Sequence, residues 1–227
     1  MNHIGQKRIV VLISGSGSNL QAIIDACESG QINGKVVAVL SNKPLVKGLE
    51  RAKKYNIPAI TLQHGDYSSR ESFDNALANS LVDFNADLIV LAGFMRILSP
   101  DFVNQFQGKM LNIHPSLLPK YPGLHTHQRA LDNGDLIHGA SIHFVTAELD
   151  GGPIVIQAQV NVASNDNVNT LAHKVAQKEW IIYPMVVSWF CDERLTLIGD
   201  QVYFDKTIIK TQGISYESLD SNAKPII

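Results

Sequence analysis

Short, continuously apolar runs recur along the first half of the chain and alternate with segments in which apolar residues follow helical spacing. The apolar runs span residues 8–13, 35–40, 57–62 and 87–92. Continuous apolar runs of this length are typical of strands that are buried on both faces. The helical segments span residues 20–27, 45–55, 69–84 and 100–106. This alternation predicts a Rossmann-like, doubly wound α/β fold with a mostly parallel sheet and right-handed crossovers.

The pattern changes in the second half of the chain. A short apolar run at residues 110–113 predicts another strand, and residues 140–145 and 154–162 predict two more, joined by a turn and antiparallel. These strands place antiparallel pairing toward the C-terminal half. A long helix is predicted at residues 170–190, which Pro184 is expected to kink or divide.

The end of the chain predicts a hairpin followed by a tail. Residues 195–204 indicate two strands centred on Gly199-Asp200, and the polar tail from Thr211 is expected to be poorly ordered. We find no repeat or linker, so we expect one domain over residues 1–227. Within this domain we expect an N-terminal half at residues 8–106, a catalytic half at residues 107–210 and a tail at residues 211–227.

The composition of the chain disfavours several kinds of binding partner. The 227 residues carry a formal net charge of −2 and show no basic face, which disfavours nucleic-acid binding. Two distant cysteines form no metal or disulfide pattern. No stretch resembles a signal peptide or reaches membrane length. We therefore expect a cytoplasmic protein whose partners are small molecules.

Four polar features follow predicted strands. They are a Gly-rich turn (residues 14–19), a loop after the fourth strand that we call the Gly93 loop (residues 93–98), the pair Asn112 and His114, and the segment that enters the turn at Asp150. Ligands of open parallel sheets bind beyond the carboxyl ends of the strands. We therefore expect these features to converge on one active site.

The Gly-rich turn departs from a dinucleotide-binding fingerprint. Leu20 occupies the third glycine position, and no acidic residue follows the second strand, so NAD binding is disfavoured. A phosphate monoester held by Gly17, Ser18 and Asn19 fits better, because a helix N-terminus offers free N–H groups. The alternative is a tight turn with a good N-cap and no ligand.

Asn112, His114 and Asp150 have the chemistry of a charge-stabilising site. Asn112 and His114 lie two residues apart on a predicted strand, so their side chains face the same side. Asp150 lies in an Asp-Gly-Gly turn, which either presents its carboxylate to the imidazole or simply forms the turn. An amide donor, an imidazole and a carboxylate together favour oxyanion stabilisation and proton transfer.

Several other polar residues allow two interpretations. Five histidines lie between residues 114 and 143, but neither an HExxH motif nor an acidic residue at ligand spacing accompanies them, so no metal is predicted. His143 either supports the site or is a hydrogen-bonded sheet residue. His125 and His127 are interpreted as structural or supporting, and His138 as a surface residue. Glu179, Arg70 and Arg96 are surface residues by default, although an arginine on an apolar loop also suits an anionic or planar ligand.

Four motifs resemble the folate-dependent formyltransferases. They are Leu-Ile-Ser-Gly-Ser-Gly-Ser-Asn-Leu at residues 12–20, Ala-Gly-Phe-Met-Arg-Ile-Leu at 92–98, Asn-Ile-His-Pro-Ser-Leu-Leu-Pro at 112–119 and Asp-Gly-Gly-Pro at 150–153. The similarity covers roughly residues 8–200. The Gly-rich turn most resembles that of members acting on a ribonucleotide in purine synthesis.

This resemblance implies transfer of the formyl group of 10-formyltetrahydrofolate to the amine of phosphoribosylglycinamide. It implies the catalytic residues Asn112, His114 and Asp150, and the ribonucleotide-binding residues Gly17, Ser18, Asn19 and Glu179. It implies the folate-binding residues Arg70, Met95, Arg96, Ile97, Leu98, Asn112, Thr146 and Asp150. Ala176 departs from relatives that carry a polar residue there. We expect no metal, no membrane or nucleic-acid partner, and a monomer or weak homodimer.

Three other activities are considered. A formyltetrahydrofolate hydrolase uses the same trio with water as acceptor, but usually carries an additional N-terminal regulatory domain. A methionyl-tRNA formyltransferase needs a basic C-terminal domain. A non-catalytic Rossmann-type nucleotide or phosphate sensor needs no intact trio. A turnover assay with the ribonucleotide or water as acceptor discriminates between these activities.

Overall fold

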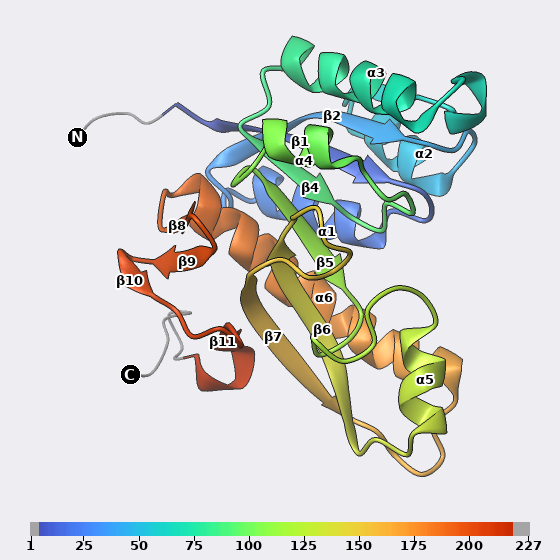
Figure 1. The fold of residues 1–227 in the computed structure, drawn as a ribbon, viewed down its shortest axis with the longest axis vertical. Helices are drawn as coiled ribbons and strands as arrows, with labels where there is room; N and C mark the ends of the chain where they lie inside the picture. The colour runs from blue at the N-terminus through green and yellow to red at the C-terminus, as the bar shows by residue number, and fades with distance from the viewer. Residues whose placement is uncertain (1–4, 220–227) are drawn as a thin grey trace.

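A computed structural model describes residues 5–219 of the chain. Its main sheet has eight strands in the order β11-β7-β6-β5-β4-β1-β2-β3 (Figure 1). These strands are β1 (Lys7–Ile13), β2 (Gly34–Ser41), β3 (Ala59–Thr61), β4 (Leu88–Leu91), β5 (Met110–His114), β6 (Ile137–Phe144), β7 (Ile154–Asn161) and β11 (Ile214–Ser215). A second sheet contains β8 (Leu195–Ile198), β9 (Gln201–Phe204) and β10 (Thr207–Ile208).

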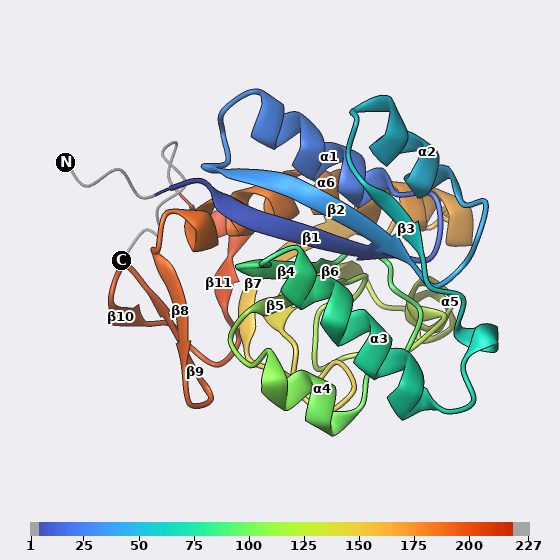
Figure 2. The ribbon, with the colours of Figure 1, turned by 90° about the horizontal axis from the view of Figure 1, so that it is seen from above.

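Helices cover both faces of the main sheet. They are α1 (Ser18–Glu28), α2 (Lys47–Lys54), α3 (Arg70–Asp83), α4 (Pro100–Gln105), α5 (Thr126–Asp132) and α6 (Val168–Cys191), with 3₁₀ turns at His64–Asp66 and Tyr216–Ser218. Figure 2 shows α1, α2 and α6 on one face and α3 and α4 on the other. A hydrophobic core lies on each face of the sheet, and alternate residues of β1 belong to different cores. Ile9 and Val11 pack on the α1 and α6 side, and Val10 and Leu12 pack on the α3 side. Burial on both faces explains why β1 is apolar throughout.

The predicted fold class is confirmed. β1 pairs in parallel with β2 and β4, and β4 pairs in parallel with β5. β6 then runs antiparallel to both β5 and β7. Because the order of the parallel strands reverses between β1 and β4, the Gly-rich turn and the Gly93 loop emerge side by side at the carboxyl edge.

Pro184 does not divide the long helix, contrary to our expectation. Residues 168–191 form one continuous helix with Pro184 inside it. The carbonyl that proline leaves without an N–H partner belongs to Trp180, whose side chain is 37% exposed, so this carbonyl lies near solvent. The preceding residues Ile182 and Tyr183 are fully buried, and this packing stabilises the helix across the proline.

The prediction of a poorly ordered tail is wrong for the residues up to 219. Ile214 pairs with Ile156, and this adds β11 in parallel to the edge strand β7. The Glu217 side chain accepts a hydrogen bond of 3.0 Å from the Gln159 N–H. The rest of the tail, residues 220–227, lies outside the described residues. The sequence patterns also did not predict α5, β10 or the two 3₁₀ turns.

None of the helices within residues 5–219 has both the length and the apolar character that crossing a bilayer requires.

Candidate active site

The end of β5 brings Asn112 and His114 against Asp150. Asn112 and His114 lie opposite His143 and Ser141 of β6, which fixes their positions at the sheet edge. Asp150 follows β6 in a turn and adopts a left-handed backbone with φ of 50°. The His114 Nδ1 atom lies 3.4 Å from Asp150 Oδ2, and both side chains are nearly buried. The structure therefore assembles the three residues that the sequence pointed to.

Both ring nitrogens of His114 face hydrogen-bond acceptors. Nε2 lies 2.8 Å from the backbone carbonyl of Tyr121, and a carbonyl can only accept. Nε2 therefore carries a hydrogen, and Nδ1 faces the Asp150 carboxylate. The imidazole ring is therefore held at both of its nitrogens.

His143 orients the Asn112 amide. The Nδ1 of His143 donates to the Phe144 carbonyl at 2.9 Å, so its Nε2 accepts from Asn112 Nδ2 at 3.0 Å. Burial lowers the pKa of His143, which keeps the ring neutral and able to accept. Asn112 Nδ2 also has a longer contact of 3.4 Å to Asp150 Oδ1. The second amide hydrogen therefore points at the Asp150 carboxylate and makes only this long bond.

The turn at Asp150 is pressed closely against its neighbours. Asp150 Oδ2 accepts a hydrogen bond of 2.8 Å from the Gly123 N–H. A Cβ atom at Gly152 would lie 1.8 Å from the Phe144 carbonyl oxygen, so only glycine fits there. The Asp-Gly-Gly sequence therefore does more than form a turn, because it sets the carboxylate between β5 and the segment around Gly123.

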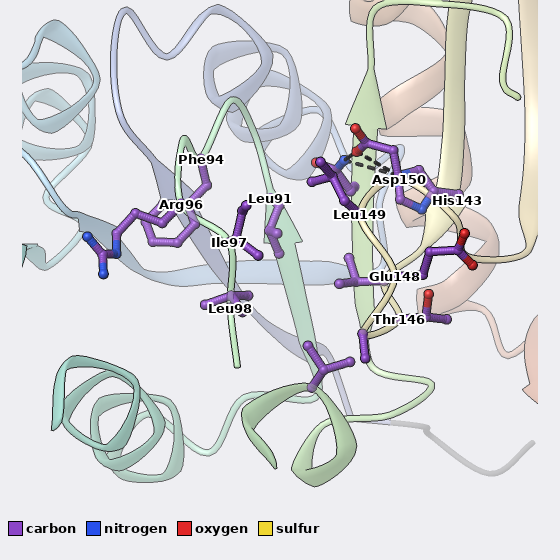
Figure 3. A pocket seen from close by; sticks show the side chains of 14 residues that line it. Leu91, Phe94, Arg96, Ile97, Leu98, His143, Thr146, Glu148, Leu149 and Asp150 are labelled. Atoms are coloured by element: carbon purple, nitrogen blue, oxygen red, sulfur yellow. Dashed lines mark hydrogen bonds and ion pairs between the residues drawn. The ribbon is translucent and has the colours of Figure 1, made fainter. Parts of the chain in front are cut away.

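A pocket extends from this cluster between the Gly93 loop and the turn that follows β6 (Figure 3). Its lining is mostly apolar, with polar groups at its two ends. The predicted residues that line it are Arg96, Ile97, Leu98, Asn112, His143, Thr146 and Asp150. Phe94, Glu148 and Leu149 also line it, although the sequence patterns did not single them out.

Arg70 contacts the Gly93 loop and Met95 belongs to it, but neither residue lines this pocket. The Arg70 guanidinium donates to the Leu98 carbonyl. Met95 is 61% exposed, and its backbone N–H donates to the Ser14 hydroxyl. Arg96 stacks over the Phe73 ring at 4.6 Å, and its Nε is buried without a partner among the described residues.

The Gly-rich turn ends at the N-terminus of α1. Gly17 has φ of 69°, and a Cβ atom there would lie 2.7 Å from the Gly48 Cα, so the turn requires glycine for two reasons. Gly17 is the N-cap residue, and no side chain caps the helix. Such an uncapped helix end directs free N–H groups and positive potential at the same point, which suits an anion.

Glu179 is largely buried, so its default interpretation as a surface residue is wrong. Asn19 Nδ2 donates to Glu179 Oε2 at 2.8 Å, across α1 and α6. Burial raises the pKa of Glu179 despite this bond. The other amide atom, Asn19 Oδ1, is buried without a partner among the described residues. These two residues therefore form a polar pair beside the Gly-rich turn.

His138 is also buried, contrary to the prediction of a surface residue. Its side chain pairs with His127, with 3.1 Å between His138 Nε2 and His127 Nδ1, because β6 carries it under α5. His125 is the N-cap residue of α5 and has φ of 60°. Within residues 5–219, no group of three histidine, cysteine or carboxylate side chains is arranged to hold a metal ion.

Sequence reasoning assigned no individual role to several polar residues next to the site. Tyr121 provides the carbonyl that His114 contacts, and Ser14 and Asn42 bond to each other beside the Gly93 loop. Tyr183 is fully buried, and its hydroxyl lies 2.9 Å from the carbonyls of Leu91 and Leu111. Ser14 and Asn42 directly follow predicted strands, which is the signal that could have found them.

Comparisons with known proteins agree with this geometry. A family model described as formyl transferase matches residues 7–187. Phosphoribosylglycinamide formyltransferase of Escherichia coli (strain K12) is 53% identical over 205 residues, which are 90% of this chain and 97% of that protein. The enzyme of that name from Haemophilus influenzae is 46% identical over 93% of this chain and 100% of its own length.

A solved structure of phosphoribosylglycinamide formyltransferase from Coxiella burnetii superposes with a TM-score of 0.89. It is 45% identical and covers 92% of this chain and 99% of the other. The site geometry, the family model and these relatives agree, and the chain belongs to the formyl transferase family.

Proposed function

We propose that the chain transfers a formyl group from 10-formyltetrahydrofolate to the amine of phosphoribosylglycinamide in purine biosynthesis. Its relatives at 46–53% identity over most of the chain are phosphoribosylglycinamide formyltransferases. The observation that carries the chemical role is the cluster in which His114 Nδ1 lies 3.4 Å from Asp150 at the mouth of a mostly apolar pocket. This cluster combines donors and a buried carboxylate where a carbonyl oxygen becomes negative.

The ribonucleotide fits the Gly-rich turn. The uncapped N–H groups at Ser18 and Asn19 suit its phosphate, because no side chain of residues 5–219 caps this helix end. The Asn19 amide is already bonded to Glu179, so the phosphate is held mainly by backbone groups. Asn19 Oδ1, which has no partner in the described part of the chain, and the Glu179 carboxylate suit hydroxyl donors of the ribose.

The folate fits the pocket between the Gly93 loop and the Asp150 turn. Ile97 and Leu98 offer an apolar surface for a planar ring, and Thr146 and Asp150 offer polar contacts. The unpartnered Nε of Arg96 and the guanidinium of Arg70 suit the carboxylates at the other end of the folate. When bound, the folate supplies the formyl carbonyl that the amine attacks.

Three residues then stabilise the charges of the reaction. Two long contacts of the cluster, each 3.4 Å to Asp150, come from the second amide hydrogen of Asn112 and from His114 Nδ1, and these donors can turn from Asp150 to the oxygen that becomes negative. Asp150 balances the positive charge of His114 and fixes its orientation. A free α-amino group has a pKa of about 8, so neutral amine is available near neutral pH. Its proton passes to the leaving folate nitrogen through His114 or a water molecule.

The experiment is a turnover assay with 10-formyltetrahydrofolate and either phosphoribosylglycinamide or water as the acceptor. We expect formyl transfer to the ribonucleotide to dominate. Asp150→Asn removes the charge beside His114 with little change in volume, so kcat should fall by about 10²–10³-fold, as for other losses of oxyanion stabilisation.

The control is Asp132→Asn, because Asp132 lies on α5 and its carboxylate bonds Gln128 at 2.7 Å, away from the site. Titration of ribonucleotide into Asp150→Asn should give the wild-type Kd. Near-wild-type kcat in that variant contradicts the mechanism, and hydrolysis without transfer in the wild type contradicts the function.

A further inference from the structure

A serine hydroxyl joins the loops that follow three adjacent strands. Ser14 follows β1, Asn42 follows β2, and Met95 lies in the Gly93 loop after β4, with β1 between the other two strands. The Met95 N–H donates to Ser14 Oγ at 2.7 Å, and Ser14 Oγ donates to Asn42 Oδ1 at 2.5 Å. Ser14 is 7% exposed and Asn42 is 2% exposed, so water competes little for these bonds.

Each of these two hydrogen bonds can run in only one direction. A backbone N–H can only donate and an amide oxygen can only accept, so the hydroxyl must accept from Met95 and donate to Asn42. This fixes the hydroxyl rotamer and, with it, the distance between the Gly-rich turn and Met95. The link lies where the strand order reverses, between β1 and β4.

The Gly93 loop depends on this link. Residues 93–98 have no regular secondary structure. Within the described part of the chain, the only backbone hydrogen bond made by residues 93–97 is the one from Met95 to Ser14. The loop is next held at Leu98 by Arg70 and at Ser99 by Asp74. Apart from the stacking of Arg96 on the Phe73 ring, the stretch between Gly93 and Ile97 is therefore held from the Gly-rich turn.

We infer that Ser14 is a positioning residue that couples the two substrate sites. It is the first residue of the turn that we propose binds the ribonucleotide phosphate, and it holds the loop that we propose binds the folate. Ordering of the Gly-rich turn by the ribonucleotide therefore orders the Gly93 loop through Ser14, and each substrate binds more tightly when the other is present. This inference rests on the proposed function.

The test measures coupling rather than turnover. Tetrahydrofolate, the product, is titrated into the protein with and without phosphoribosylglycinamide, a pair that cannot react. In the wild type, the ribonucleotide should tighten tetrahydrofolate binding by about fivefold or more, the lower range of ordinary coupling. In Ser14→Ala this ratio should fall to about one. Because the coupling is reciprocal, tetrahydrofolate should likewise lose its effect on ribonucleotide binding, while the Kd of the ribonucleotide alone stays as in the wild type.

Ser41→Ala is the matched control. Ser41 is a buried serine at the end of the neighbouring strand, and among the described residues its hydroxyl bonds only the backbone of Lys43, at 2.7 and 3.1 Å. It should keep the wild-type coupling ratio. A wild-type ratio of one, or an unchanged ratio in Ser14→Ala, overturns the inference.

If Ser14→Ala fails to fold, hydrogen exchange of the wild type still tests the inference. Amides of residues 93–98 should exchange several-fold more slowly when the ribonucleotide alone is bound, and no change contradicts the coupling. Failure of the proposed function is seen separately, as absence of formyl transfer by the wild type with both substrates.

Discussion

At the scale of single residues, the site contains buried polar atoms that have no hydrogen-bond partner within residues 5–219. Asn19 Oδ1 and Arg96 Nε are examples, one at each proposed substrate site. A buried polar group without a hydrogen bond costs about 1–3 kcal/mol, so such atoms persist where a ligand supplies the missing bond. Glu179 belongs with them, because its carboxylate is buried with a single hydrogen bond from Asn19.

Glu179→Gln is predicted to stabilise the free protein at neutral pH. Burial raises the pKa of Glu179 above its value in the unfolded chain. The folded state therefore holds the proton more strongly, and stability falls as the pH rises from the unfolded pKa through the folded one. A neutral glutamine removes this cost, so Tm should rise by about 2 °C or more at pH 7.5 and by less near pH 4.

The same substitution should weaken ribonucleotide binding by about tenfold, since a charged acceptor is lost. Calorimetry over pH and ligand titration measure the two effects. Glu28→Gln, at an exposed carboxylate, should change neither. A lower Tm for Glu179→Gln at pH 7.5 contradicts the argument.

At the scale of elements, the segment between β5 and β6 (residues 115–136) completes the surroundings of His114. It provides the Tyr121 carbonyl at 2.8 Å from His114 and the Gly123 N–H that bonds Asp150. Its interior is held by hydroxyl groups, since Ser141 Oγ donates to the Ser116 carbonyl at 2.7 Å. The geometry of His114 therefore depends on a segment that contains only one short helix.

This segment is predicted to loosen in mild acid. Burial lowers the pKa of His138 to about 4, and it also lowers that of His127. The unfolded segment takes up protons near pH 6.5, while the folded one resists, so stability is lost as the pH falls from about 6.5 toward about 4. Amides of residues 115–136 should exchange faster at pH 5 than at pH 7.5, after correction for intrinsic rates, and turnover should fall in parallel.

A variant that lacks one histidine of the His127 and His138 pair tests this cause. His138→Gln should reduce the change in exchange between pH 7.5 and pH 5, whereas His173→Gln, at an exposed position on α6, should leave it unchanged. Equal pH dependence in the wild type and His138→Gln contradicts the proposed cause.

At the scale of the whole molecule, one sheet combines segments from both halves of the chain. Strands β1 and β4 carry the Gly-rich turn and the Gly93 loop, and β5 and β6 carry the catalytic cluster. The edge beyond β7 is covered by β11, whose Ile214 is 6% exposed. Lys178 of α6 also lies over the Tyr216 ring at 4.7 Å.

Removal of residues 211–227 is predicted to lower stability and to leave activity intact. Burial of a side chain such as Ile214 contributes about 1.5–3 kcal/mol, which corresponds to a decrease in Tm of about 5 °C or more for a chain of this size. No proposed site residue lies beyond Glu179, so kcat at 25 °C should stay within about twofold. Thermal unfolding and the turnover assay measure both; an unchanged Tm contradicts a stabilising role for β11.

The amino-acid sequence by itself determined the elements of the sheet and the position of the chemistry. Continuous apolar runs identify doubly covered strands because every side chain of such a strand meets a helix layer. Polar residues after those runs fall on the ligand edge of a parallel sheet. Two-residue spacing on a strand was sufficient to place Asn112 and His114 on one side.

Only the tertiary structure decided which polar residues are buried and what they contact. His138 and Glu179 look like surface residues because local spacing does not reveal that α5 covers one and α1 the other. Pro184 remains inside a helix because packing of its buried neighbours outweighs one lost hydrogen bond. The bond between Ser14 and Met95 joins residues 81 positions apart, and no local pattern encodes such a contact.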